Sequence, residues 1–182
     1  MVKGAGPRHF EISKKGAFIY VINELNSTIT VLQKETKNNY TTMQYVITKE
    51  FTFEAAHRLL RNYCGKCSNN HGHSYRVKLH LQGTNLDEKD MLIDFNETKK
   101  LKAWIDENLD HVTMLWEEDP MIDSMRTFGN KVLVTKKNPT AEHIAELILA
   151  EAQRLFENSA IQVKCIEINE TCTSAARLYP LS

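Results

Sequence analysis

The sequence predicts an α+β domain in which an antiparallel sheet carries two helices on one face. Two stretches, 51–57 and 76–82, alternate between apolar and polar residues, as strands with one buried face do. Two further stretches, 101–109 and 144–155, repeat apolar residues at the spacing of a helix. An apolar strand over 161–172 completes the order strand, strand, helix, helix, strand, which is typical of an α+β fold.

Residues 1–42 precede this domain and differ from it. Two short strands joined by a turn are expected between residues 17 and 32, followed by a polar linker over 34–42. The stretch 4–33 resembles part of a blade of the lactonase-type β-propellers, and one partial blade cannot bury its own faces. The chain is therefore expected to divide into an appended N-terminal extension with its linker, 1–42, and a main domain, 43–182.

Residues that start helices mark both helical stretches of the main domain. Asp94 or Asn96 is the expected cap of the first helix, which ends near Asp110. Pro139-Thr140 opens the second helix, with Thr140 as its cap. The segment 116–138 between the helices shows little periodicity and is expected to be irregular.

Arg177-Leu-Tyr adds a short fourth strand to the sheet. With both helices on one face, the other face of the four-stranded sheet is left uncovered. A domain of this size would expose much of that face to water. We therefore expect the chain to form a homo-oligomer.

The composition excludes several classes of protein. The 182 residues carry 23 basic and 23 acidic side chains, so the formal net charge is zero. General binding to nucleic acid or to a membrane surface would be expected to show a basic surplus. The sequence shows neither a signal peptide nor an apolar run of membrane-spanning length, and four cysteines without an export signal indicate reduced thiols. We therefore expect a cytoplasmic protein that binds neither nucleic acid nor membrane.

Three histidines form a candidate metal site. His71 and His73 lie two residues apart at the start of one predicted strand, so they share a face, and His57 ends the apolar face of another strand. Imidazoles on apolar faces are costly to bury without a ligand, and three of them fit a catalytic zinc with one open position. One alternative is a non-catalytic structural zinc module with four ligands, Cys64, Cys67, His71 and His73, and the other is a set of hydrogen-bonded core histidines that bind no metal.

Six motifs occur in order along the main domain. They are Phe53-Glu-Ala-Ala-His57-Arg-Leu, Cys67-x3-His71-Gly-His73-Ser-Tyr, Leu92-Ile-Asp-Phe95, Leu109-Asp110-His111, Asn138-Pro-Thr-Ala-Glu142 and Glu170-Thr-Cys-Thr173. This set resembles the 6-pyruvoyl-tetrahydropterin synthase family, over about residues 44 to 180. The resemblance implies the tunnelling fold (T-fold), in which four-stranded antiparallel sheets of several subunits close into a barrel with the helices outside. It also implies active sites at subunit junctions and a homo-oligomer, most simply a hexamer of two trimers.

The resemblance also implies a zinc ion on the three histidines and a set of catalytic residues. The catalytic residues that it implies are Cys67, Asp110 and His111. A thiolate is a competent base where its surroundings lower the pKa of the thiol. An imidazole can relay the proton while a carboxylate fixes its tautomer.

The substrate that the resemblance implies is 7,8-dihydroneopterin triphosphate. Glu170 matches the residue that anchors the pterin ring. A carboxylate can accept two parallel N–H bonds from the guanidine-like edge of a pterin. Thr140 and Glu142 are secondary candidates for substrate binding.

Each of these residues also has a purely structural explanation. His111 follows a helix, where a histidine can interact with the C-terminal dipole. Glu170 can pair with a core arginine such as Arg177. Glu142 lies in the first turn of a helix, where acidic residues are common because of the dipole.

Two branches of the family compete. The spacing Cys67-x3-His71 and the motif Glu170-Thr-Cys-Thr resemble the branch of queuosine biosynthesis, which forms 6-carboxy-5,6,7,8-tetrahydropterin and releases acetaldehyde and triphosphate. The run Gly65-Lys-Cys-Ser-Asn-Asn resembles the tetrahydrobiopterin branch, which forms 6-pyruvoyl-tetrahydropterin. Cys64 is an addition to the simple pattern, and its role is open.

Overall fold

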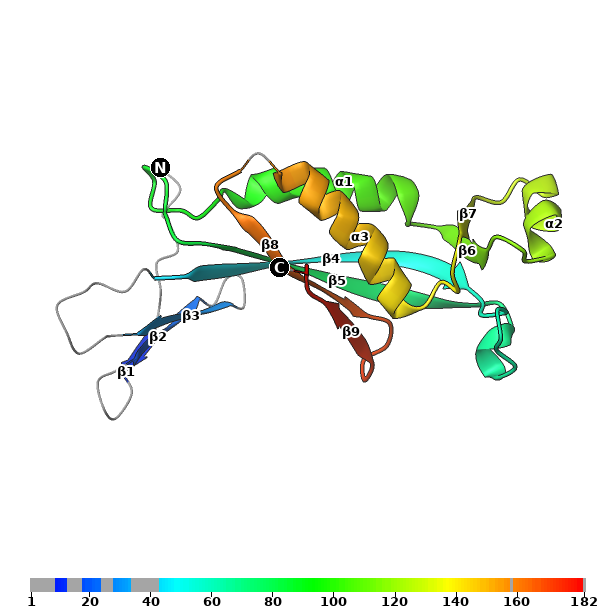
Figure 1. The fold of residues 1–182 in the computed structure, drawn as a ribbon, viewed down its shortest axis with the longest axis horizontal. Coiled ribbons are helices and arrows are strands. Elements are labelled where there is room, and N and C mark those ends of the chain that lie inside the picture. Colours follow the sequence, from blue (N-terminus) through cyan, green and yellow to red (C-terminus); the bar gives the residue numbers. More distant parts are fainter. Residues whose placement is uncertain (1–8, 13–17, 24–27, 34–42, 158, 182) are drawn as a thin grey trace.

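A computed structural model describes residues 9–12, 18–23, 28–33, 43–157 and 159–181 (Figure 1). Near the N-terminus, three strands form a small antiparallel sheet in the order β1-β2-β3. The strands are β1 (His9–Ile12), β2 (Phe18–Asn23) and β3 (Thr28–Gln33). The two short strands expected there are thus confirmed, whereas the expected linker lies outside the described residues.

The main sheet has six strands in the order β7-β6-β4-β5-β8-β9. Four of them pair antiparallel, namely β4 (Tyr45–His57), β5 (His71–Gly83), β8 (Gln162–Asn169) and β9 (Ala175–Leu178). The other two are β6 (Val112–Trp116) and β7 (Val132–Thr135). They extend the sheet in parallel beside the end of β4. The predicted α+β class and its four antiparallel strands are confirmed, and the sheet is larger and mixed.

The prediction that residues 116–138 are irregular is wrong. This segment contains α2 (Met121–Thr127) and β7. Both elements are too short to show a periodic pattern, and Asp119 marks the start of α2 by accepting a hydrogen bond from the Met121 N–H (2.8 Å). The last long strand also ends earlier than predicted, at Asn169, because a turn follows in which the Glu170 N–H donates to the Ser174 carbonyl (3.2 Å).

The two long helices pack on one face of the sheet, as predicted (Figure 1). A 3₁₀ turn, η2 (Phe95–Thr98), leads into α1 (Lys99–Asn108). Asp94 caps η2 by accepting from the Asn96 N–H, and Thr140 caps α3 (Ala141–Phe156) by accepting from the His143 N–H (3.4 Å). No helix in the described part of the chain is both long and apolar enough to cross a bilayer.

Alternate residues of β4 and β5 form the core beneath these helices. Phe53 and Tyr75 are register partners, and their rings stack with centroids 4.9 Å apart. Other core side chains from these strands and helices include Phe51, Val77, Leu79, Leu81, Leu101, Ile105, Ile144 and Ile148. Because successive side chains of a strand alternate between faces, the opposite face of the sheet carries the polar positions.

A buried carboxylate organises part of that polar face. Glu167 is 3% exposed and accepts hydrogen bonds from the Lys78 ammonium (2.8 Å), the Arg177 guanidinium and the Asn169 amide (3.2 Å). Burial alone would raise the pKa of Glu167, but the hydrogen bonds from Lys78 and Arg177 outweigh it and hold this pKa below its ordinary value of 4.5.

We predict that Glu167 stabilises the fold at neutral pH and not in acid. Because its folded-state pKa is depressed, its contribution is present above about pH 4.5 and is lost as the pH falls through the folded-state pKa. Glu167→Gln should therefore lower the free energy of unfolding at pH 7 by about 1–3 kcal/mol, and the difference from wild type should shrink below about pH 4.5. Denaturant unfolding at matched protein concentrations measures this. The exposed Glu88→Gln is the control, and a pH-independent difference would contradict the prediction.

Candidate metal and catalytic site

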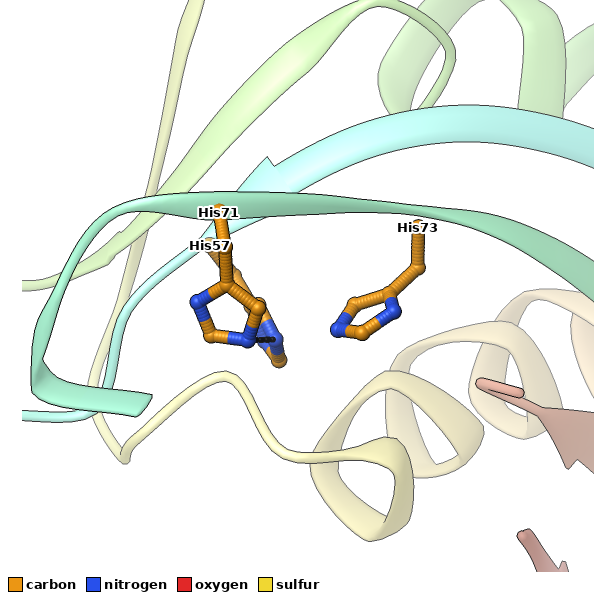
Figure 2. Close-up of side chains that lie close together, drawn as sticks. All are labelled: His57, His71 and His73. Carbon is orange, nitrogen blue, oxygen red and sulfur yellow. Dashed lines mark hydrogen bonds between the residues drawn. The ribbon is translucent and has the colours of Figure 1, made fainter. Parts of the chain in front are cut away.

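The ends of β4 and β5 bring three imidazoles together. His57 is the last residue of β4, and its register partner is His71, the first residue of β5. His73 lies two residues further along β5, so its side chain projects from the same face. Figure 2 shows the three rings pointing toward one another on this face. The strands thus place the histidines as the sequence predicts.

The distances between these rings suit a shared ligand. Their centroids are 4.6, 4.9 and 5.1 Å apart, and one nitrogen from each ring lies within 4.8 Å of the others. The Nε2 atoms of His57 and His71 are 3.2 Å apart. A tetrahedral zinc with Zn–N distances of about 2.0–2.1 Å would hold its nitrogens roughly 3.3 Å apart.

Hydrogen bonds to carbonyls fix the tautomers of two of these rings. Nδ1 of His57 lies 2.7 Å from the Pro139 carbonyl oxygen, and Nδ1 of His71 lies 2.8 Å from that of Asn69. A carbonyl can only accept, so both Nδ1 atoms carry the proton. In neutral rings both Nε2 atoms are then lone-pair acceptors that face each other, an arrangement that a cation between them would stabilise.

His57 is the most buried member of the cluster, at 2% exposure. Burial lowers its pKa, although the Pro139 carbonyl and the Glu170 carboxylate act in the opposite direction. Glu170 lies 3.5 Å from His57 Nε2, and the Tyr75 hydroxyl lies 3.4 Å from His57 Nδ1. A lowered pKa keeps the imidazole neutral, which is the form that binds a metal.

Within the described part of the chain, this trio is the one group of His, Cys, Asp and Glu side chains close enough to share a metal. Neither Cys64 nor Cys67 belongs to it, and both thiols are free. The geometry therefore favours the open three-histidine set over the closed set with two cysteines.

A pocket of about 260 Å³ adjoins His57 and collects other residues singled out from the sequence. Its lining residues from that group are Cys67, Thr140, Glu142 and Glu170. Cys67 returns toward His57 because its carbonyl accepts from the Leu59 N–H (2.8 Å), which closes the intervening loop. The start of α3 and the turn from β8 into β9 supply the other walls, so four separate segments meet here.

The alternative explanation, in which Glu170 pairs with Arg177, is wrong. Arg177 is the register partner of Glu167 and bonds to that residue instead. Glu170 lies beyond the end of β8 and turns toward His57, with 26% of its side chain exposed. Its carboxylate therefore faces the pocket beside the histidines.

Asp110 and His111 lie elsewhere. Asp110 accepts from the Glu54 N–H and lies 2.8 Å from His111 Nδ1, and these two bonds hold its pKa below the ordinary value, the first more strongly. His111 adopts a left-handed backbone (φ 56°) and is 79% exposed in its side chain. Its imidazole bonds to the carboxylate and to no carbonyl of α1 among the contacts of the described residues, which favours a relay over a dipole contact.

His111 of this pair lines a second groove, of about 400 Å³, to which His73 also contributes. Glu54 and Ser74 line that groove, and they project from the face of β4 and β5 opposite the histidine cluster. Within one chain, the predicted relay therefore lies apart from Cys67 and from the pocket beside His57, which we call the metal pocket.

Two contacts at the end of β4, one of His57 and one of Arg58, could not be expected from residue types. One is the Pro139 carbonyl, because a backbone atom carries no sequence signal. The other lies beside it, where Arg58 bonds to the fully buried carboxylate of Asp119 (2.7 Å from Nε) and ties the end of β4 to the start of α2. The only hint of the latter was an Asp-Pro pair of the kind that starts helices.

The family model described as 6-pyruvoyl tetrahydropterin synthase matches residues 46–180. A curated relative, the 6-carboxy-5,6,7,8-tetrahydropterin synthase of Rickettsia bellii, is 38% identical over 128 residues, which are 68% of this chain and 92% of the relative.

Solved structures share the fold. An uncharacterized protein from Wolinella succinogenes superposes with a TM-score of 0.66 at 25% identity, covering 75% of this chain and 98% of that one. A variant of Plasmodium vivax 6-pyruvoyltetrahydropterin synthase gives 0.60 at 19% identity, covering 76% and 98%. These likenesses confirm the T-fold.

A second family model, described as a lactonase 7-bladed β-propeller, matches residues 1–63. The expected likeness of residues 4–33 to such a blade is thus also found. The two matches overlap over 46–63, where the structure places most of β4 in the main sheet. Residues 46–57 of this overlap therefore form part of the T-fold sheet.

We predict that removing one imidazole removes the metal. His57→Ala should lose most bound zinc, because two nitrogens remain where three converged. Cys64→Ser should keep its zinc, because this thiol lies outside the cluster. Zinc content after dialysis, measured by mass spectrometry of the purified proteins, decides the matter. Full zinc in His57→Ala together with loss in Cys64→Ser would identify the closed cysteine-containing site instead.

Proposed function

Because the chain belongs to the 6-pyruvoyl tetrahydropterin synthase family, we propose that it forms 6-carboxy-5,6,7,8-tetrahydropterin for queuosine biosynthesis. As a member it is a lyase-type enzyme. Its substrates would be 7,8-dihydroneopterin triphosphate and water, and its other products acetaldehyde and triphosphate. The observation that carries the proposal is a pocket lined by His57 of the three-histidine cluster together with the thiol of Cys67 and the carboxylate of Glu170. The Rickettsia bellii relative bears the name of this activity.

Glu170 would orient the substrate. Its carboxylate sits at the pocket wall, unpaired with any arginine of the described residues, and can accept two parallel N–H bonds from the guanidine-like edge of the pterin. Thr140 and Glu142, at the start of α3, line the same pocket. The ring would thus be held at one end, with its side chain directed to the histidines.

His57, His71 and His73 would hold a zinc ion, which would serve as a Lewis acid toward the hydroxyls of the substrate side chain. Cys67 would serve as the base that takes a proton from a side-chain carbon bearing such a hydroxyl. His111 would receive and return that proton, while Asp110 fixes its tautomer through the 2.8 Å contact at Nδ1.

The division of these residues between two pockets supports a shared active site. Cys67 lines the metal pocket, whereas His111 borders the groove on the opposite face of the sheet. We propose that copies of the chain assemble so that the His111 groove of one meets the Cys67 loop of the next. The T-fold resemblance implies such junctions in a hexamer of two trimers.

A second candidate is formation of 6-pyruvoyl-tetrahydropterin, the activity of the biopterin branch. The run Gly65-Lys-Cys-Ser-Asn-Asn favours it. The same pocket residues would serve either reaction, because both begin with loss of triphosphate and proton transfer on the side chain. The fate of the side chain separates the two reactions.

We predict that incubation with dihydroneopterin triphosphate releases acetaldehyde and leaves one carboxyl carbon on the pterin. Mass analysis of the pterin and a trap for acetaldehyde measure both products. Cys67→Ala should lower turnover by about 10²–10⁴-fold, whereas Cys64→Ala should leave it near wild type. An intact three-carbon side chain without acetaldehyde would move the chain to the biopterin branch, and the absence of any turnover by the zinc-loaded protein would overturn both activities.

We also predict that two inactive variants restore each other. If each site takes Cys67 from one copy and His111 from a neighbour, mixed oligomers of Cys67→Ala and His111→Ala should regain about a quarter of wild-type activity at equal mixing. The matched control is a mixture of Cys67→Ala with His57→Ala, which line one pocket of one chain and should stay inactive. Equal recovery in both mixtures, or in neither, would refute the shared site.

A further inference from the structure

The side chain of Asn138, which lines neither pocket, makes three hydrogen bonds to the backbone. Its side-chain oxygen accepts from the Leu60 N–H (3.1 Å) and the Arg61 N–H (2.9 Å), and its amide nitrogen donates to the Arg61 carbonyl (2.8 Å). The partners are 77 and 78 residues away in sequence. One side chain thus satisfies three backbone groups of a loop on which it does not itself lie.

We infer that Asn138 is a positioning residue. Its side chain holds the loop between His57 and Cys67 and thereby positions both the metal ligand His57 and the catalytic thiol of Cys67. The inference rests on the proposed function for the roles of those two residues. It adds a residue that acts through others and contacts neither substrate nor metal.

The loop has little internal structure of its own. Its regular element is the single turn η1 (Lys66–Ser68), and Asn62 adopts a left-handed backbone (φ 54°). Backbone N–H and C=O groups need partners to hold one conformation. Asn138 supplies three at residues 60 and 61, and the Leu59 N–H bond to the Cys67 carbonyl then closes the loop. Without the bonds from Asn138, the loop would move more freely at residues 60 and 61, and the bond between Leu59 and Cys67 would weaken.

The same residue is joined to the metal ligand through its neighbour. Pro139 follows directly, and its carbonyl accepts the Nδ1 proton of His57 (2.7 Å). The proline ring fixes its own φ and restricts Asn138 to extended backbone, so a shift of Asn138 moves this carbonyl. The Asn138 carbonyl in turn accepts from the N–H of Thr140, the cap of α3 (2.8 Å). The segment 138–140 therefore links loop, ligand and helix.

An asparagine suits this position because it offers an acceptor and a donor on a short side chain. Aspartate would keep the two accepted bonds and lose the donated one. Alanine would lose all three. The two substitutions should therefore differ in the size of their effect, with alanine the stronger and aspartate the weaker.

The test uses the full chain and two measurements that need no turnover. Zinc affinity is measured by competition with a chelator. The rate at which iodoacetamide alkylates Cys67 is measured on metal-free protein by peptide mass mapping, so that it reports the loop alone. Gln82→Ala is the matched control, because its amide also makes a hydrogen bond (to Gln162, 3.3 Å) but at the far end of β5. Circular dichroism checks folding.

Asn138→Ala should weaken zinc binding by roughly 10–100-fold and speed Cys67 alkylation several-fold. Asn138→Asp should fall between this variant and wild type in both measurements. A folded Asn138→Ala with wild-type zinc affinity and alkylation rate would overturn the inference. If that variant does not fold, wild-type values in Asn138→Asp overturn it equally. A wild-type protein that binds zinc but turns over no pterin would refute the proposed function and leave this result standing.

Discussion

The pairing register of β4 and β5 is the constraint on which the rest of the structure depends. Because side chains alternate between faces, pairing His57 with His71 directs both imidazoles, and His73 with them, to the helix-covered face. A slip of one residue would reverse the faces of an entire strand. The stacked rings of Phe53 and Tyr75 lie on this same face and favour the observed register. The apolar packing that stabilises the sheet thus also assembles the histidine cluster.

The surroundings of the cluster explain why a cation suits it. Burial lowers the pKa of His57, and carbonyls hold the Nδ1 protons of His57 and His71, so the Nε2 lone pairs converge. Converging acceptors in a partly buried site are costly without a partner. The nearby carboxylate of Glu170 adds negative charge at the same place. A divalent cation offsets these costs together, whereas a closed site with Cys64 would leave His57 unexplained.

The fold distributes chemistry between the two faces of one sheet. The metal pocket lies on the face covered by α1 and α3, whereas the Asp110–His111 pair borders a groove on the opposite face. In one copy Asp110 and His111 lie away from Cys67, and the proposed shared active site would bring these residues together from different copies. Glu167 shows that this opposite face is organised by charge as well as by shape.

The sequence by itself determined the strands that carry the histidines, the two long helices and the cap at Thr140, because a half-buried strand and an amphipathic helix each leave a periodic pattern. Its likeness to a known family also pointed to Glu170. Only the tertiary structure revealed α2 and β7, whose few residues show no period. Only the register of β8 with β9 decided that Arg177 bonds Glu167 and leaves Glu170 to the pocket. The carbonyl that orients His57 lies on a residue 82 positions away, and such a backbone contact exists only once the chain has folded.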